Sequence, residues 1–236
     1  MAKRGVKSAG DAEPSQTTDE SSSSTPAPPG KLHVSLTAIA KGVVLHRVHQ
    51  SIYQSDQFNP GIQGNARFSP IQDERGNPIP ILYCGTTVQC ALMETIFHDV
   101  PHSAGFKSFD KGKLARQVHS TIQIERELQL VDLTSVSLRK LGVMRKQLID
   151  TEKSQYPATR SWAAAIHDQC PKAQGLFWVS RQDDSACAVV LFGDRIPDGA
   201  LRSIGISRSL LGDADAYDVV LDLADRIGVN LVQGKL

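Results

Sequence analysis

The sequence lacks the features that define several large classes of protein. No apolar run approaches the roughly 18 residues that span a membrane, and none of signal-peptide length follows the early Lys and Arg residues. The net charge is only +1, so no overall field draws the molecule to nucleic acid or to anionic lipid. We therefore expect a protein of the cytoplasm that contacts neither membranes nor nucleic acid directly.

Several signatures of catalysis and cofactor binding are also missing. No G-x-G-x-x-G or Walker loop is present, which argues against Rossmann and P-loop nucleotide binding, and no G-x-S-x-G elbow indicates a serine hydrolase. The four cysteines have no C-x-x-C spacing, so we interpret them as buried free thiols of a reducing compartment. His98 and His102 suggest a metal pair, with Glu94 as a further ligand, but Pro101 interrupts the helix and no other ligand is indicated. We expect no metal.

The first thirty residues differ from the rest of the chain. From Ser8 to Gly30 almost nothing is apolar except Ala and Pro, and the segment ends in SSSSTPAPPG. Such a composition cannot bury enough surface to offset the loss of chain entropy. Residues 1–30 are therefore predicted to form a disordered Ser/Pro-rich leader, and residues 31–236 to form one domain with its own core.

The apolar pattern predicts a mixed α+β fold. Strands are expected where apolar residues alternate or run together, at residues 43–48, 79–83, 117–124, 128–133, 175–180 and 187–193. Helices are expected where apolar residues recur at helical spacing, at residues 86–98, 137–148, 157–170 and 215–228. Because strands often follow one another with helices inserted, largely antiparallel sheets with packed helices fit better than a regular βαβ alternation.

The predicted helix at residues 86–98 carries an unusual carboxylate. Thr86 or Thr87 can cap its first turn, and apolar side chains lie on most of its sides, which predicts a buried helix. Glu94 is the only carboxylate between Thr86 and His98, so we expect little water around it. A buried carboxylate needs a partner or a function, which makes Glu94 the first candidate for a site residue.

Other polar residues lie in or beside apolar runs, and together with Glu94 they resemble the motifs of the RES family, named for its Arg, Glu and Ser. The matching segments, in chain order, are LHRV (45–48) with Arg47, GNARF (64–68) with Arg67, the eleven-residue step from Tyr83 to Glu94, GLFWVSR (175–181) with Ser180, and AVVLF (188–192). The resemblance covers about residues 43–193. GNARF departs from the family's Gly-Gly-Arg-Trp, and Ser185 competes with Ser180 for the family's serine.

The resemblance implies a function and a set of site residues. RES proteins are similar in fold to ADP-ribosyltransferases and act as toxins that deplete NAD, their substrate, by cleaving its nicotinamide–ribose bond with water or phosphate as acceptor. Transfer of ADP-ribose to a protein is the alternative, and an inactive nucleotide- or partner-binding module is another. The resemblance carries over Glu94, Arg67, Tyr83 and Ser180 as catalytic residues, and Arg47, Arg67 and Tyr83 as NAD-binding residues. It also implies an antitoxin partner with a helix-turn-helix domain.

The chemistry of NAD cleavage suits these residue types. Breaking the bond builds positive charge on the ribose, as in glycoside cleavage, and a fixed carboxylate stabilises that charge. An arginine fork matches a pyrophosphate better than lysine does. Nicotinamide is already a good leaving group, so the reaction requires no strong general acid.

Overall fold

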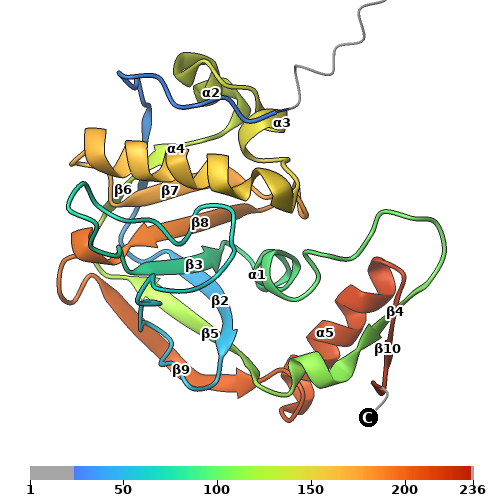
Figure 1. Ribbon diagram of the computed structural model, residues 1–236. Coiled ribbons are helices and arrows are strands. Elements are labelled where there is room, and N and C mark those ends of the chain that lie inside the picture. Colours follow the sequence, from blue (N-terminus) through green and yellow to red (C-terminus); the bar gives the residue numbers. More distant parts are fainter. Residues whose placement is uncertain (1–23, 235–236) are drawn as a thin grey trace, which may run out of the picture.

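The fold is organised around one curled sheet, which a computed structural model shows within residues 24–234 (Figure 1). Its eight strands, in sheet order, are β1 (Leu36–Ile39), β6 (Leu128–Asp132), β7 (Gly175–Val179), β8 (Cys187–Phe192), β3 (Ile81–Gly85), β2 (Val44–Gln50), β5 (Gln117–Ile124) and β9 (Leu201–Ser209). The β6–β7 pair is parallel and the other neighbours are antiparallel. The predicted mixed, largely antiparallel α+β fold is confirmed.

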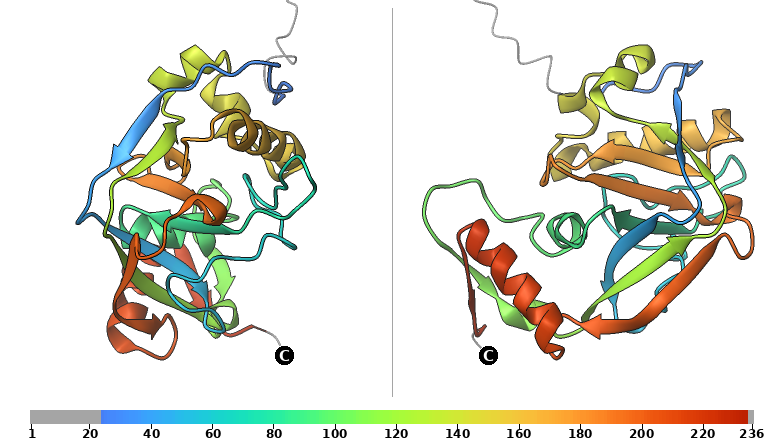
Figure 2. Two further views of the ribbon diagram at one scale, coloured as in Figure 1. Left: turned by 90° about the vertical axis from the view of Figure 1, so that its left-hand side faces the viewer. Right: turned by 180° about the vertical axis from the view of Figure 1, so that it is seen from behind.

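Helices cover the sheet on more than one side (Figures 1 and 2). They are α1 (Val88–Thr95), α2 (Ser135–Leu141), α3 (Arg145–Leu148), α4 (Tyr156–Gln169) and α5 (Ala214–Arg226), with short 3-10 turns η2 (Lys111–Leu114), η3 (Lys153–Gln155) and η4 (Gly193–Arg195). Helix α4 lies across β6, β7 and β8, whereas α1 lies between the sheet and α5. A small parallel pair, β4 (Lys107–Asp110) and β10 (Val229–Val232), lies beside α5. None of the helices within residues 24–234 has the length and apolar character to cross a bilayer.

The predicted helix at residues 137–148 is wrong in one respect, because two helices occupy this segment. Gly142 has φ = 73°, the left-handed conformation that glycine adopts without a steric penalty, and it ends α2. The chain then resumes as α3. The helix predicted at residues 86–98 also ends early, at Thr95 rather than His98.

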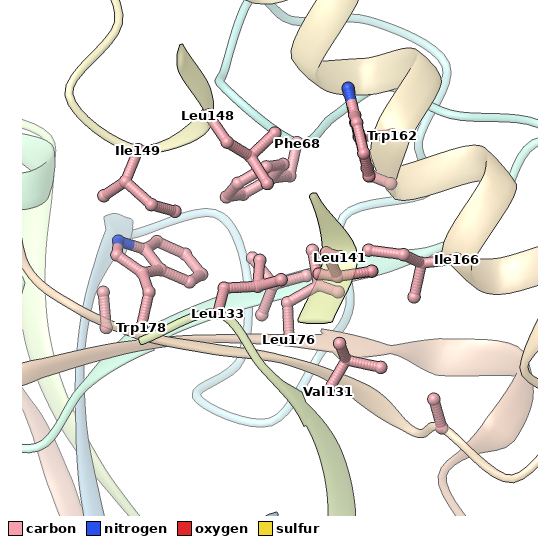
Figure 3. Packing of buried hydrophobic residues seen from close by; sticks show 14 of the residues in the cluster. Phe68, Val131, Leu133, Leu141, Leu148, Ile149, Trp162, Ile166, Leu176 and Trp178 are labelled. Carbon is pink, nitrogen blue, oxygen red and sulfur yellow. The ribbon is translucent and has the colours of Figure 1, made fainter. Parts of the chain in front are cut away.

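The strands alternate between two buried clusters, one on each face of the sheet. On β8, Val190 belongs to the cluster under α4, whereas Val189 and Leu191 belong to the cluster inside the curl. The cluster under α4 contains both tryptophans, Trp162 and Trp178, together with Phe68 (Figure 3). A third cluster joins α1 to α5 and β10, so α1 is packed on both sides.

Residues 24–34, which we call the N-terminal strap, run along the helices above the sheet. The carbonyl oxygen of Pro26 accepts a hydrogen bond of 2.7 Å from the indole Nε1 of Trp162, which is buried. The backbone N–H of Thr25 donates to Oε1 of Gln155 at 3.1 Å. Residues 24–30 of the predicted leader therefore contact the domain, and residues 1–23 of that leader lie outside the described residues.

Candidate active site

A pocket of about 470 Å³ opens between α1, the strands β2 and β3, and the segment that contains η3. Four of the five predicted site residues line it: Arg47, Arg67, Tyr83 and Glu94. Ser180 does not line it, but contacts it through Glu94. The structure thus gathers residues that lie up to 133 positions apart in the chain, from Arg47 to Ser180.

The position of Glu94 follows from the way α1 begins and packs. Thr87 caps the helix by accepting a hydrogen bond of 3.0 Å from the backbone N–H of Cys90. Gly85 lets α1 lie directly on β3, because a Cβ atom there would meet the backbone nitrogen of Ala91 at 2.8 Å. The side chain of Glu94, on the last turn, is 18% exposed. The helix is buried, as predicted, and its one carboxylate faces the pocket.

Ser180 fixes one oxygen of the Glu94 carboxylate through a hydrogen bond. Its hydroxyl donates to Oε1 of Glu94 at 2.6 Å and accepts from the backbone N–H groups of Gln182, at 3.0 Å, and Asp183, at 3.1 Å. Ser185 instead donates to Oδ1 of Asp183 and is exposed. Of the two candidate serines, Ser180 is therefore the one beside Glu94.

Arg67 faces the other oxygen of the same carboxylate. Its Nη1 lies 3.8 Å from Oε2 of Glu94, and its guanidinium lies 5.9 Å from the ring centre of Tyr156. The backbone carbonyl of Arg67 accepts a hydrogen bond from the buried hydroxyl of Thr159, which ties the loop to α4. The side chain is 7% exposed, and its Nε has no hydrogen-bond partner within residues 24–234.

Tyr83 fixes the loop that carries Arg67. Its phenol oxygen accepts a hydrogen bond of 3.1 Å from the backbone N–H of Phe68. Burial raises the pKa of Tyr83 to about 12, so the phenol stays neutral at ordinary pH. Tyr83 thus contributes a neutral ring to the pocket wall.

Arg47 organises the neighbouring loop. Its Nη1 donates to the backbone carbonyls of Gln54 at 3.2 Å, Ser55 at 2.7 Å and Gln57 at 2.7 Å. The side chain is 6% exposed, and burial lowers its pKa from the ordinary value. Arg47 therefore lines the pocket, but its Nη1 group is already hydrogen-bonded to the backbone of the neighbouring loop.

Sequence reasoning missed several residues of the pocket. Two ion pairs lie at its rim: Nζ of Lys153 is 2.5 Å from Oδ2 of Asp99, and Nη2 of Arg181 is 3.0 Å from Oε1 of Glu152. Trp178 also lines the pocket. Arg181 and Trp178 lie inside the GLFWVSR motif, so the motif was the available signal for them.

Metal ligands do not gather in the part of the chain that the structure describes. Within residues 24–234 no three His, Cys, Asp or Glu side chains form a group that could hold a metal ion. His98 instead contacts the carbonyl of Thr95 at 3.0 Å and Asp99 at 3.2 Å.

The fold and the pocket define an α+β protein with a mostly buried carboxylate, fixed by a serine and faced by an arginine, at the wall of a ligand-sized cavity. The chain belongs to the RES family: the model of the RES domain matches residues 44–213, a range that contains all five predicted site residues. The predicted membership is confirmed. The family is associated with NAD-consuming toxins and with toxin–antitoxin systems. A comparison with curated proteins found no match.

Proposed function

We propose that the protein depletes NAD by cleaving its nicotinamide–ribose bond, as a glycohydrolase or a phosphorylase. The observation that carries the proposal is the carboxylate of Glu94, which Ser180 orients and Arg67 faces inside the pocket. Family membership supports NAD as the substrate.

In the proposed reaction, the electron pair of the glycosidic bond leaves with the ring nitrogen of nicotinamide, which becomes neutral. The ribose carbon then carries positive charge, and the carboxylate of Glu94 stabilises that charge. Water adds to this carbon and releases a proton to give ADP-ribose, or phosphate adds to give a ribose phosphate ester. Arg67 and, more weakly, Arg47 contact the pyrophosphate, while the ring of Tyr83 contacts nicotinamide.

The test is release of nicotinamide from NAD by the purified protein, followed by chromatography with and without phosphate. ADP-ribose as the product identifies the hydrolase, a ribose phosphate ester identifies the phosphorylase, and ADP-ribose attached to protein identifies the transferase. If wild-type protein releases no nicotinamide under any of these conditions, the proposal fails and a binding module is the better description.

Glu94→Gln connects this activity to the pocket. The amide removes the negative charge, so we expect turnover to fall by roughly 10²–10³. The fold should survive because the amide oxygen can still accept from Ser180. A melting curve and a release rate are measured on the same preparation.

The matched control for Glu94→Gln is Glu74→Gln, which removes an exposed carboxylate outside the pocket and should change neither quantity. Wild-type release by the folded Glu94→Gln protein would contradict the proposed role of Glu94.

We further propose that the protein acts in the cytoplasm and that an antitoxin with a helix-turn-helix domain restrains it. The family's association with toxin–antitoxin systems supports the partner. Expression in a bacterial host should arrest growth, and Glu94→Gln should abolish the arrest. Growth arrest by both proteins would point to toxicity that does not depend on this site.

A further inference from the structure

Buried polar atoms without partners concentrate at the pocket. Five such side-chain atoms occur within residues 24–234, and three belong to residues that line it: Nε of Arg67, Oε1 of Gln117 and Nε1 of Trp178. Leaving a buried donor or acceptor unpaired is costly, and native proteins rarely do so. Their grouping around one cavity indicates that a ligand supplies the missing partners.

Trp178 is the most deeply buried of the three. It is 1% exposed, and its ring meets that of Phe68 edge-on, with centroids 5.1 Å apart and an interplanar angle of 70°. In Figure 3 its indole nitrogen lies on the side of the ring that points away from Leu176 and Ile166. The donor therefore does not point into the centre of the cluster.

The other tryptophan of the same cluster shows how this fold treats an indole N–H that has no ligand to bind. Trp162 is also 1% exposed, but its Nε1 donates to the carbonyl of Pro26 at 2.7 Å. The N-terminal strap thus satisfies one buried indole, while no described residue satisfies that of Trp178. The two tryptophans also differ in their position relative to the pocket: Trp178, with the unpaired indole, lines it, and Trp162 does not.

Trp178 lines the same pocket as the carboxylate of the site. It lies in β7, two residues before Ser180, and the hydroxyl of Ser180 bonds to Glu94. The pocket wall around them includes the rings of Tyr83 and Tyr156 and the small side chain of Ala188, which is paired with Trp178 across the β7–β8 ladder. This part of the pocket suits a flat aromatic group that carries one hydrogen-bond acceptor.

We infer that Trp178 binds the nicotinamide group of the substrate and that its indole N–H donates to the carboxamide oxygen. This inference rests on the proposed function. Nicotinamide is flat and presents a carbonyl oxygen, the acceptor that an indole N–H requires. Adenine lacks a carbonyl oxygen, and the charged pyrophosphate fits the arginines better than an aromatic wall.

The experiment uses the indole N–H signals in a ¹H–¹⁵N spectrum of the full chain, which has only two tryptophans. Titration with nicotinamide should shift the Trp178 signal downfield and leave the Trp162 signal in place. Trp178→Phe assigns the signal by removing it. The same titration with 3-methylpyridine, which has the ring without the carbonyl, should produce no downfield shift.

Affinity gives the second measurement. Trp178→Phe keeps an aromatic ring but loses the N–H donor together with part of the indole, so we expect nicotinamide to bind at least about tenfold more weakly, the effect of one lost hydrogen bond. Trp162→Phe is the matched control, because it removes the other indole N–H and should leave the affinity unchanged.

Three results would overturn the inference. The first is a Trp178 signal that stays in place at every nicotinamide concentration, and the second is equal affinity of wild type and Trp178→Phe for nicotinamide. The third is a shift of the Trp178 signal that ADP-ribose causes and nicotinamide does not. If Trp178→Phe does not fold, Trp162→Phe assigns the two indole signals instead, and the wild-type titration decides. None of these measurements depends on turnover. A protein that binds nicotinamide at Trp178 but leaves NAD intact would contradict the proposed function and not this inference.

Discussion

At the scale of single residues, Ser180 uses the full hydrogen-bonding capacity of its hydroxyl inside the protein. A serine hydroxyl has one donor and two acceptor positions. Here the donor bonds to Glu94 and the acceptors receive the backbone N–H groups of Gln182 and Asp183. The serine is also fully buried. We therefore interpret Ser180 as a positioning residue that acts through Glu94, rather than as a group that touches nicotinamide.

Ser180→Ala tests this interpretation. The change leaves one carboxylate oxygen and two backbone N–H groups without the hydroxyl, so the free energy of unfolding should fall by about 1–3 kcal/mol. Turnover, assayed at a temperature well below the melting temperature, should also fall, because Glu94 loses its fixed orientation. The KM for NAD should change little. Ser185→Ala removes only a contact with Asp183 and serves as the control. An unchanged kcat for Ser180→Ala would remove Ser180 from the site.

The residues of the site were only partly predictable. Glu94 stood out because a lone carboxylate on an apolar helix is unusual, and this signal is local in the sequence. Only its place inside the GLFWVSR motif marked Trp178, because an aromatic residue in an apolar strand otherwise resembles any core residue. Its unpaired indole becomes evident only when the partner of every buried polar atom is known in three dimensions.

At the scale of elements, the sequence predicted best those strands whose two faces differ. β5 alternates buried and half-buried residues along its whole length and was predicted with its observed bounds, residues 117–124. β9 was missed because it is an edge strand, with most of its residues exposed, so no apolar alternation marks it. The short strands β1, β4 and β10 were also missed, because strands of four residues give too little pattern.

The N-terminal strap leads to a prediction about deletions. Removing residues 1–23 should leave the melting temperature unchanged, whereas removing residues 1–30 should lower it by several degrees, because the indole of Trp162 then loses the Pro26 carbonyl. NAD turnover should survive both deletions, since the strap does not line the pocket. Pro26→Ala keeps the backbone carbonyl and should be nearly neutral. Equal melting temperatures for the two deletions would show that the strap adds no stability.

At the scale of the whole molecule, side-chain contacts of histidines join β2 to β5 in the sheet. His46 and His119 contact each other through ring nitrogens 3.0 Å apart, and Nε2 of His49 lies 2.8 Å from the hydroxyl of buried Ser120. Burial, followed by the charge of Arg47, lowers the pKa of His49 to about 4. Burial, followed by the neighbouring His46, lowers the pKa of His119 to about 4. The folded protein therefore holds these rings in their neutral form.

The lowered pKa values predict that stability declines in acid. At a pH above 6.5, the ordinary value for histidine, the rings are neutral in both the folded and the unfolded chain. As the pH falls from 6.5 towards 4, the unfolded chain binds protons that the folded protein does not, so the free energy of unfolding decreases. The melting temperature should fall over this interval.

Substitution separates the histidines from the acidic groups that also titrate. His119→Gln should reduce the fall in melting temperature between pH 6.5 and 4, whereas His102→Gln, at an exposed position, should leave it unchanged. Identical pH profiles for the two variants would contradict the assignment to His119.

The hydrogen bond between Ser180 and Glu94 has a consequence for the newly made chain. Its two residues are 86 positions apart, and β3, which precedes Glu94, pairs with β8, which follows Ser180. A ribosome adding about 5–20 residues per second needs roughly 4–17 s to proceed from the first residue to the second. During that interval Glu94 has been synthesised but has no serine to orient it. The nascent protein therefore passes through a period in which its proposed activity against NAD is not yet assembled.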